Sequence, residues 1–79
     1  MDPGIAIAPN PASDRLRIGW SADLPQADIQ LLDLQGKTVL SVNNATPGHE
    51  LDLTSLSKGV YLLQLSDAGK RWSRKLVVN

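Results

Sequence analysis

Apolar and polar residues alternate along most of the chain with a period of two. Leu16, Ile18 and Trp20 are separated by arginine or glycine, as expected for a strand with one buried face. A short apolar run from Ile5 to Ala8 precedes them. The same alternation recurs later at Ile29 and Leu31, at Leu40 and Val42, at Leu51 and Leu53, at Tyr61, Leu63 and Leu65, and at Leu76 and Val78.

Turn-forming residues lie between these segments. Pro9-Asn10-Pro11 fixes two φ angles, removes two backbone donors and separates the opening strand from the second. Gln35-Gly36 predicts a tight hairpin, because glycine adopts positive φ at little cost. Asn43 to Gly48 predicts a looser loop, and Ser57-Lys58-Gly59 and Asp67-Ala68-Gly69 predict further turns. Seven short strands without a helical segment predict an all-β fold, a seven-stranded antiparallel immunoglobulin-like β-sandwich.

The inward positions of these strands form the predicted core: Leu16, Ile18, Ile29, Leu31, Leu51, Leu53, Tyr61, Leu63 and Leu65. Leu32 and Leu34 break the alternation of the third strand. The break predicts either a bulge near Leu31-Leu32 or a strand that is covered on both faces. The segment from Leu56 to Tyr61 looks like the tyrosine corner of immunoglobulin-like domains, in which the tyrosine hydroxyl bonds to upstream backbone. We therefore expect Tyr61 to be structural.

Composition is consistent with one small domain. The chain has 79 residues, of which 42% are hydrophobic, and a chain of this length buries roughly 60–65% of its unfolded surface. We expect the domain to span residues 5–79, with residues 1–4 as a linker or a cloning remnant. Its formal net charge is zero, so no overall field attracts nucleic acid or membrane. Cysteine is absent, which excludes disulfides and thiolate metal sites, and no segment predicts a signal peptide or a transmembrane helix.

Residues suited to catalysis are scarce. His49 is the only histidine, and beside Glu50 at a strand edge it is expected to be a surface residue. The aspartates are scattered over turns and outward strand positions, where capping and turn chemistry explains them. No glycine-rich phosphate loop and no clustered carboxylates occur. We expect no catalytic residue, no bound metal and no cofactor, and therefore no enzyme.

Basic residues are concentrated between Lys70 and Lys75, which holds half of the eight lysines and arginines. One interpretation is a surface for an acidic protein partner, with nucleic acid disfavoured. The other, which we favour from the residues alone, is an edge strand whose charges prevent edge-to-edge pairing. Trp20 is expected in the core. Trp72 is left open between packing and stacking on sugars.

Four phrases follow one another in the chain: Pro9-Asn10-Pro11, Asp33-Leu34-Gln35-Gly36-Lys37, Gly59-Val60-Tyr61 and Lys75-Leu76-Val77-Val78. In order and spacing, they resemble the type A C-terminal sorting domain of the type IX (Por) secretion system of Bacteroidetes. The resemblance covers about Ile5 to Asn79. It implies that the translocon recognises Lys75, Leu76, Val77 and Val78. It also implies structural roles for the motif residues Pro9, Asn10, Pro11, Gly36, Gly59 and Tyr61. The residue before Pro9, often aromatic in the family, is Ala8 here.

The resemblance implies a function as an address on a larger cargo protein, to which the domain is covalently joined. Such domains pass through the periplasm to the cell surface or the medium. Their partners are the type IX translocon and shuttle proteins, and a sortase-like cysteine peptidase usually removes them. Weak self-association is left open. We expect the terminal strand to be recognised by strand addition, through unpaired N–H and C=O groups along its edge.

Two other kinds of domain share the predicted fold. A fibronectin-like adhesive or carbohydrate-binding module would have the same sandwich and tyrosine corner. It would be expected to show an exposed aromatic platform or a polar groove. A spacer domain would need no recognition surface.

Overall fold

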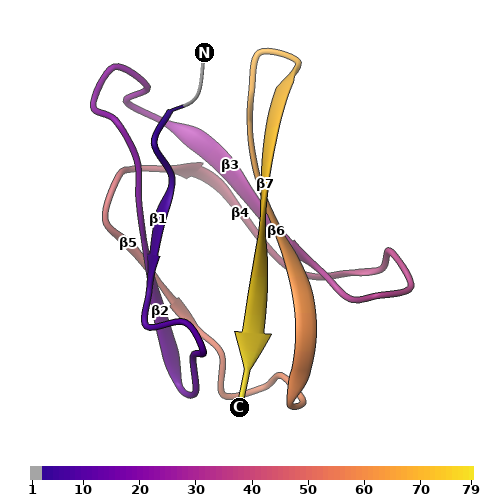
Figure 1. The fold of residues 1–79 in the computed structure, drawn as a ribbon. Coiled ribbons are helices and arrows are strands. Elements are labelled where there is room, and N and C mark those ends of the chain that lie inside the picture. Colours follow the sequence, from indigo (N-terminus) through magenta and orange to yellow (C-terminus); the bar gives the residue numbers. More distant parts are fainter. Residues whose placement is uncertain (1–2) are drawn as a thin grey trace.

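Seven strands make up the regular structure of residues 3–79, which a computed structural model describes (Figure 1). The strands are β1 (Ala6–Ala8), β2 (Arg15–Gly19), β3 (Ala27–Leu32), β4 (Thr38–Ala45), β5 (His49–Asp52), β6 (Gly59–Asp67) and β7 (Lys70–Val78). None of the described residues belongs to a helix that is long and apolar enough to cross a membrane. Met1 and Asp2, half of the expected linker, lie outside the described residues. Pro3 is buried, and its carbonyl oxygen accepts the N–H of Ser21 at 2.7 Å.

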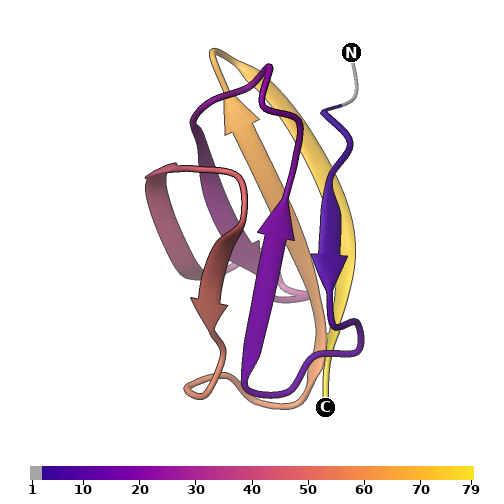
Figure 2. The same ribbon diagram turned by 90° about the vertical axis from the view of Figure 1, so that its left-hand side faces the viewer.

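The strands form two sheets that pack face to face (Figure 2). One sheet has the order β1-β2-β5 and the other the order β4-β3-β6-β7. Every pair of neighbouring strands is antiparallel. The predicted fold, a seven-stranded antiparallel sandwich, is therefore confirmed.

The core lies between the sheets and follows the alternation of the sequence. All nine residues predicted to be inward are buried, and Trp20, Leu76 and Val78 join the same cluster. Since Phe is absent, leucine and isoleucine supply most of the buried side chains, and Leu16, Ile18, Leu31 and Leu76 have no exposed surface. Burial of this apolar surface is the main force that holds the two sheets together.

Two irregularities interrupt the pairing of β3 with β4. Leu31 lies opposite Leu40, whereas Leu32 lies opposite Thr38, so the β4 strand carries one extra residue at this point. The predicted bulge near Leu31-Leu32 is confirmed, with its extra residue on the partner strand. At the other shift, Asn44 has a φ of 56°, and its N–H donates to a carboxylate oxygen of Asp28 at 2.9 Å.

The β3–β4 loop is fixed by its first residue. One carboxylate oxygen of Asp33 accepts the backbone N–H groups of Gln35 and Lys37, both at 2.9 Å. Gly36 has a φ of 84°, which confirms the predicted turn and explains the glycine. Leu34 lies between these bonds and is 79% exposed, so the break in alternation marks a surface residue.

The tyrosine corner is present. The Tyr61 hydroxyl donates to the carbonyl oxygen of Ser57 at 2.6 Å, while the ring is buried on the inner face of β6. This bond ties the β5–β6 connection to the core, as in the tyrosine corner of immunoglobulin-like domains.

Candidate functional site

The four C-terminal motif residues lie on β7 and point alternately to the two faces of the sheet. Leu76 and Val78 are buried in the core, with 0% and 3% of their surface exposed. Lys75 is exposed and Val77 is half-buried, and both belong to the outward face. Two of the four residues therefore hold the strand in the fold, and two are displayed on the surface.

The outer edge of β7 is covered at this end by the segment that follows β1. The Asn10 side-chain oxygen accepts the N–H of Val77 at 3.3 Å, and its nitrogen donates to the carbonyl oxygen of Lys75 at 3.5 Å. The N–H of Ala12 donates to the Val77 carbonyl oxygen at 2.8 Å, and the Ala12 carbonyl oxygen accepts the N–H of Asn79 at 2.7 Å. The expectation of unpaired backbone groups along this terminal edge is therefore wrong.

The cause lies in the course of the chain after β1. Residues 9–12 leave the three-stranded sheet and reach the edge of the four-stranded one, where Ala12 forms an isolated parallel bridge with Val78. Pro9 and Pro11 are exposed, and as prolines they bring no N–H group that would need a partner. The amide of Asn10, between them, supplies both a donor and an acceptor in place of backbone.

The basic segment does not form one patch. Along β7, Lys70 and Arg74 share the face of the buried Leu76, whereas Arg71 and Lys75 share the outward face. Because β7 is the last strand of its sheet, the prediction of an edge strand is confirmed.

The two tryptophans are packed into the fold. The indole N–H of Trp20 donates to the carbonyl oxygen of Leu24 at 2.7 Å, and Trp72 is half-buried against the core. Trp72, left open by the sequence, therefore serves packing. The described residues 3–79 lack the exposed aromatic platform that a carbohydrate-binding module would need.

Comparison with known families decides what kind of domain this is. The model of the family described as "Secretion system C-terminal sorting domain" matches residues 6–79. The chain belongs to this family. The resemblance noted in the sequence is thereby confirmed, and the domain is a sorting signal of the type IX secretion system. The family is one of sorting signals rather than of catalysts.

Among solved structures, one similar chain is that of PorZ, described as an essential bacterial surface component of the type IX secretion system of Porphyromonas gingivalis. The two superpose with a TM-score of 0.74 at 18% sequence identity. The alignment covers 96% of this chain and 11% of that one, so the likeness shows the fold of a small part of PorZ. No curated protein sequence matches the sorting domain.

The carboxylate of Asp52 serves the local structure of the sorting domain. The Thr54 hydroxyl donates to Asp52 at 2.7 Å and the Thr54 N–H at 2.9 Å, and these bonds lower the pKa of Asp52 below its usual value. Within residues 3–79, no three His, Asp or Glu side chains are grouped closely enough to hold a metal ion. His49 lies at the start of β5, where its backbone N–H donates to the carbonyl oxygen of Thr46.

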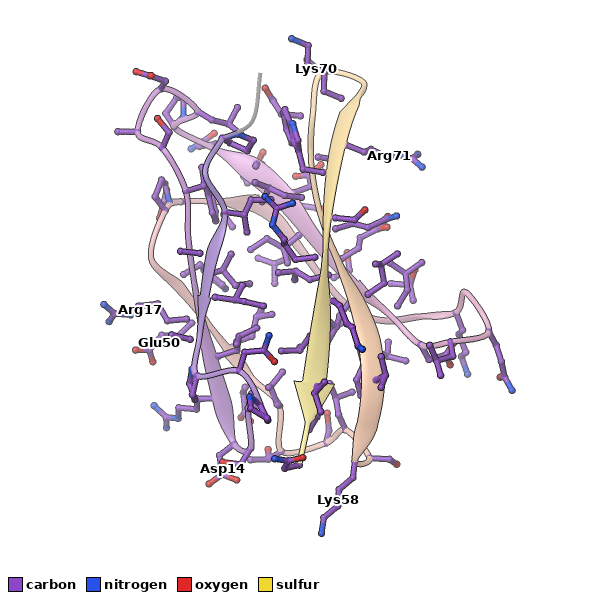
Figure 3. All side chains as sticks on the ribbon, in the orientation of Figure 1. Asp14, Arg17, Glu50, Lys58, Lys70 and Arg71 are labelled. Carbon is purple, nitrogen blue, oxygen red and sulfur yellow. The ribbon has the colours of Figure 1, made fainter. Side chains whose placement is uncertain are left out.

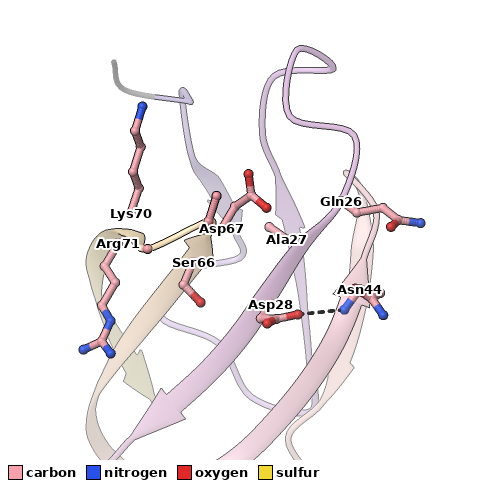
Figure 4. Close-up of a pocket in the computed structure, with 10 residues that line it drawn as sticks. Gln26, Ala27, Asp28, Asn44, Ser66, Asp67, Lys70 and Arg71 are labelled. Carbon is pink, nitrogen blue, oxygen red and sulfur yellow. Dashed lines mark hydrogen bonds between the residues drawn. The ribbon is translucent and has the colours of Figure 1, made fainter.

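A polar depression of about 310 Å³ lies where the β6–β7 hairpin meets β3 (Figure 4). Asp28 and Asp67 line it together with Lys70 and Arg71, so charges of both signs meet there. The carboxylate of Asp28 is engaged by the N–H of Asn44. The depression lies at the other end of β7 from the C-terminal motif residues.

The role of Asn10 is what sequence reasoning missed at this site. The residue stood out as part of a turn, between two prolines. Its partners on β7 are 65 and 67 residues further along the sequence, and a local sequence pattern cannot predict a contact over such a separation. The only indication in the sequence was that Asn10 lies between two prolines, which have no N–H group. In such a segment, an asparagine side chain can take the place of backbone groups in pairing with a strand.

Proposed function

We propose that this sorting domain directs a larger cargo protein through the type IX secretion system, across the outer membrane and to the surface or medium. The observation that carries the proposal is the family match over residues 6–79. The cargo is joined before the first strand, and the domain is carried as a substrate. The translocon and its shuttle proteins recognise the domain in the periplasm, and a sortase-like cysteine peptidase then removes it.

Recognition in this proposal is of the folded domain. Leu76 and Val78 are buried between the sheets, so a partner that contacted them would first have to unfold β7. Lys75 and Val77 are available on the outward face. The four motif residues thus have two roles: the inward pair positions the strand, and the outward pair meets the partner.

The arrangement of the chain favours access to this end. The chain enters β1 from the end of the sandwich opposite the C-terminus (Figure 1). A cargo that precedes β1 would therefore extend away from the outward residues of β7. Recognition and cargo attachment would not compete for the same surface.

The test is a fusion of the 79-residue chain to the C-terminus of a periplasmic reporter, in a host with a type IX system. We expect the reporter to reach the surface or medium, and the same reporter without the domain to stay in the periplasm. The variant Lys75→Glu is expected to export less while retaining its thermal unfolding, because the side chain is exposed. Retention of the unmodified fusion in the periplasm would refute the proposal.

A further inference from the structure

The outward face of the four-stranded sheet is apolar at the end that carries Val77. Val60 lies opposite Val77 across β6 and β7, and Leu62 lies opposite Leu32 across β6 and β3. All four alternate with buried neighbours, so they point away from the core. Leu62 is 38% exposed and the other three are half-buried. They form one apolar strip over three neighbouring strands.

Leu34 extends this strip beyond the sheet. It is the most exposed large apolar side chain of the described residues, at 79%. Leu34 and Val60 line one shallow depression of about 290 Å³. The bonds from Gln35 and Lys37 to Asp33 fix the loop, so Leu34 is held beside the strip. We call Leu32, Leu34, Val60, Leu62 and Val77 together the outer patch.

Lysines flank the outer patch. Lys75 lies opposite Leu62 across β6 and β7, and Lys58 lines the same depression as Leu34. Asp33 also lines that depression, so two lysines and one carboxylate lie beside the patch. The whole chain has no net charge, so the positive charge beside the patch is a local feature. Apolar surface beside lysine complements apolar side chains beside carboxylates.

We propose that the outer patch docks a protein segment of the secretion machinery that presents apolar side chains next to Asp or Glu. The inference rests on the proposed function and names the surface through which recognition occurs. A second copy of the chain would bring the same lysines toward one another, so charge opposes that pairing. Recognition of anionic lipid uses clusters of about 4–8 basic residues, more than the pair, Lys58 and Lys75, that borders this patch.

The experiment uses the full chain fused to the periplasmic reporter, with the substitutions Leu34→Ser and Lys58→Glu made separately. Both side chains are exposed, so thermal unfolding of either variant should match that of the unchanged chain. We expect each to lower the amount of surface reporter by about tenfold, as for a loss of about 1.4 kcal/mol in docking free energy. Lys70→Glu is the matched control, because Lys70 lies at the opposite end of the β6–β7 hairpin from Lys58 (Figure 3). It should export normally.

The outcomes separate the two proposals. If the unchanged fusion stays in the periplasm, the proposed function fails. If it is exported and both variants are exported equally well, the outer patch is not the docking surface, while the proposed function stands. If a variant loses its cooperative unfolding, its export cannot be interpreted. A fusion with a photo-crosslinking amino acid at position 34 is then tested instead of that variant.

In that crosslinking experiment, an adduct with a protein of the secretion machinery, lost on Lys58→Glu, supports the outer patch. Absence of any adduct from an exported fusion overturns it. So does an adduct with a second copy of the chain. Sedimentation of the purified chain with phosphatidylglycerol vesicles, abolished by Lys58→Glu, would show a lipid surface instead and would equally overturn it.

Discussion

Removing the Tyr61 hydroxyl tests the tyrosine corner without disturbing the core. In Tyr61→Phe the buried ring stays, and the 2.6 Å hydrogen bond to the Ser57 carbonyl oxygen is lost. A typical intramolecular hydrogen bond contributes about 0.5–1.5 kcal/mol. Ser57 is exposed, so water can replace the hydroxyl as partner of its carbonyl group. We therefore expect a loss near the middle of that range, about 1 kcal/mol.

For a domain of this size, that loss should lower Tm by roughly 4–8 °C. Fluorescence of Trp20 and Trp72 during denaturant unfolding reports on both sheets, since Trp20 follows β2 and Trp72 lies on β7. The fluorescence of Tyr61→Phe should show one transition, with the same m value as the unchanged chain. An unchanged m value identifies a change in stability rather than in compactness.

Two controls bound the interpretation. Leu34→Ala removes an exposed side chain and should leave the unfolding midpoint unchanged. Tyr61→Ala also leaves a cavity and should cost about 3–5 kcal/mol, comparable to the whole stability of a small domain. If Tyr61→Phe unfolds at the same midpoint as the unchanged chain, the hydroxyl does not stabilise the corner. If it is as damaging as Tyr61→Ala, the estimate from one hydrogen bond is wrong.

Further predictions concern the terminal strand, the core, one turn and one carboxylate. Asn10→Ala removes two long, exposed hydrogen bonds to β7, so it should cost less than about 1 kcal/mol but speed hydrogen exchange at the Val77 amide. Leu76→Ala opens a cavity at a fully buried position and should cost about 2–5 kcal/mol by denaturant unfolding. Ala68 has a φ of 49°, so Ala68→Asn should raise the unfolding midpoint, by up to about 1 kcal/mol in stability. Because the hydrogen bonds from Thr54 lower the pKa of Asp52, this carboxylate stabilises the fold above its unfolded pKa, and that contribution is lost as pH falls through the lower folded pKa. An NMR titration should show the low midpoint, and Thr54→Ala should raise it, whereas an unchanged midpoint would contradict the assignment.

The fold was accessible from the sequence because a strand with one buried face has a period that local reasoning detects. Leu16 and Ile18, or Leu63 and Leu65, alternate with polar or exposed neighbours, and the structure buries all four. The turn at Gly36 was equally accessible, because the preference of glycine for positive φ is a property of that residue alone.

The covered edge and the outer patch were not accessible in the same way. Asn10 contacts backbone 65 and 67 residues away, a relation that depends on the packing of the two sheets. The apolar strip needs the register of three strands, in which Val60 meets Val77 and Leu62 meets Leu32. Alternation assigned Leu76 and Val78 to one face, but a strand pattern does not report what covers its edge.

The central claim is that the folded domain is the sorting signal, and that an intact terminal sequence alone is not sufficient. The most direct measurement is surface delivery of the reporter fused to a chain with Leu16→Asp, which leaves residues 75–79 unchanged. Leu16 is fully buried on β2, in the sheet that does not contain β7, so a charge there should unfold the domain. Ala22→Asp, at an exposed turn, is the matched control. The account predicts that the Leu16→Asp fusion stays in the periplasm and the Ala22→Asp fusion is exported. Normal export of an unfolded Leu16→Asp fusion would contradict it.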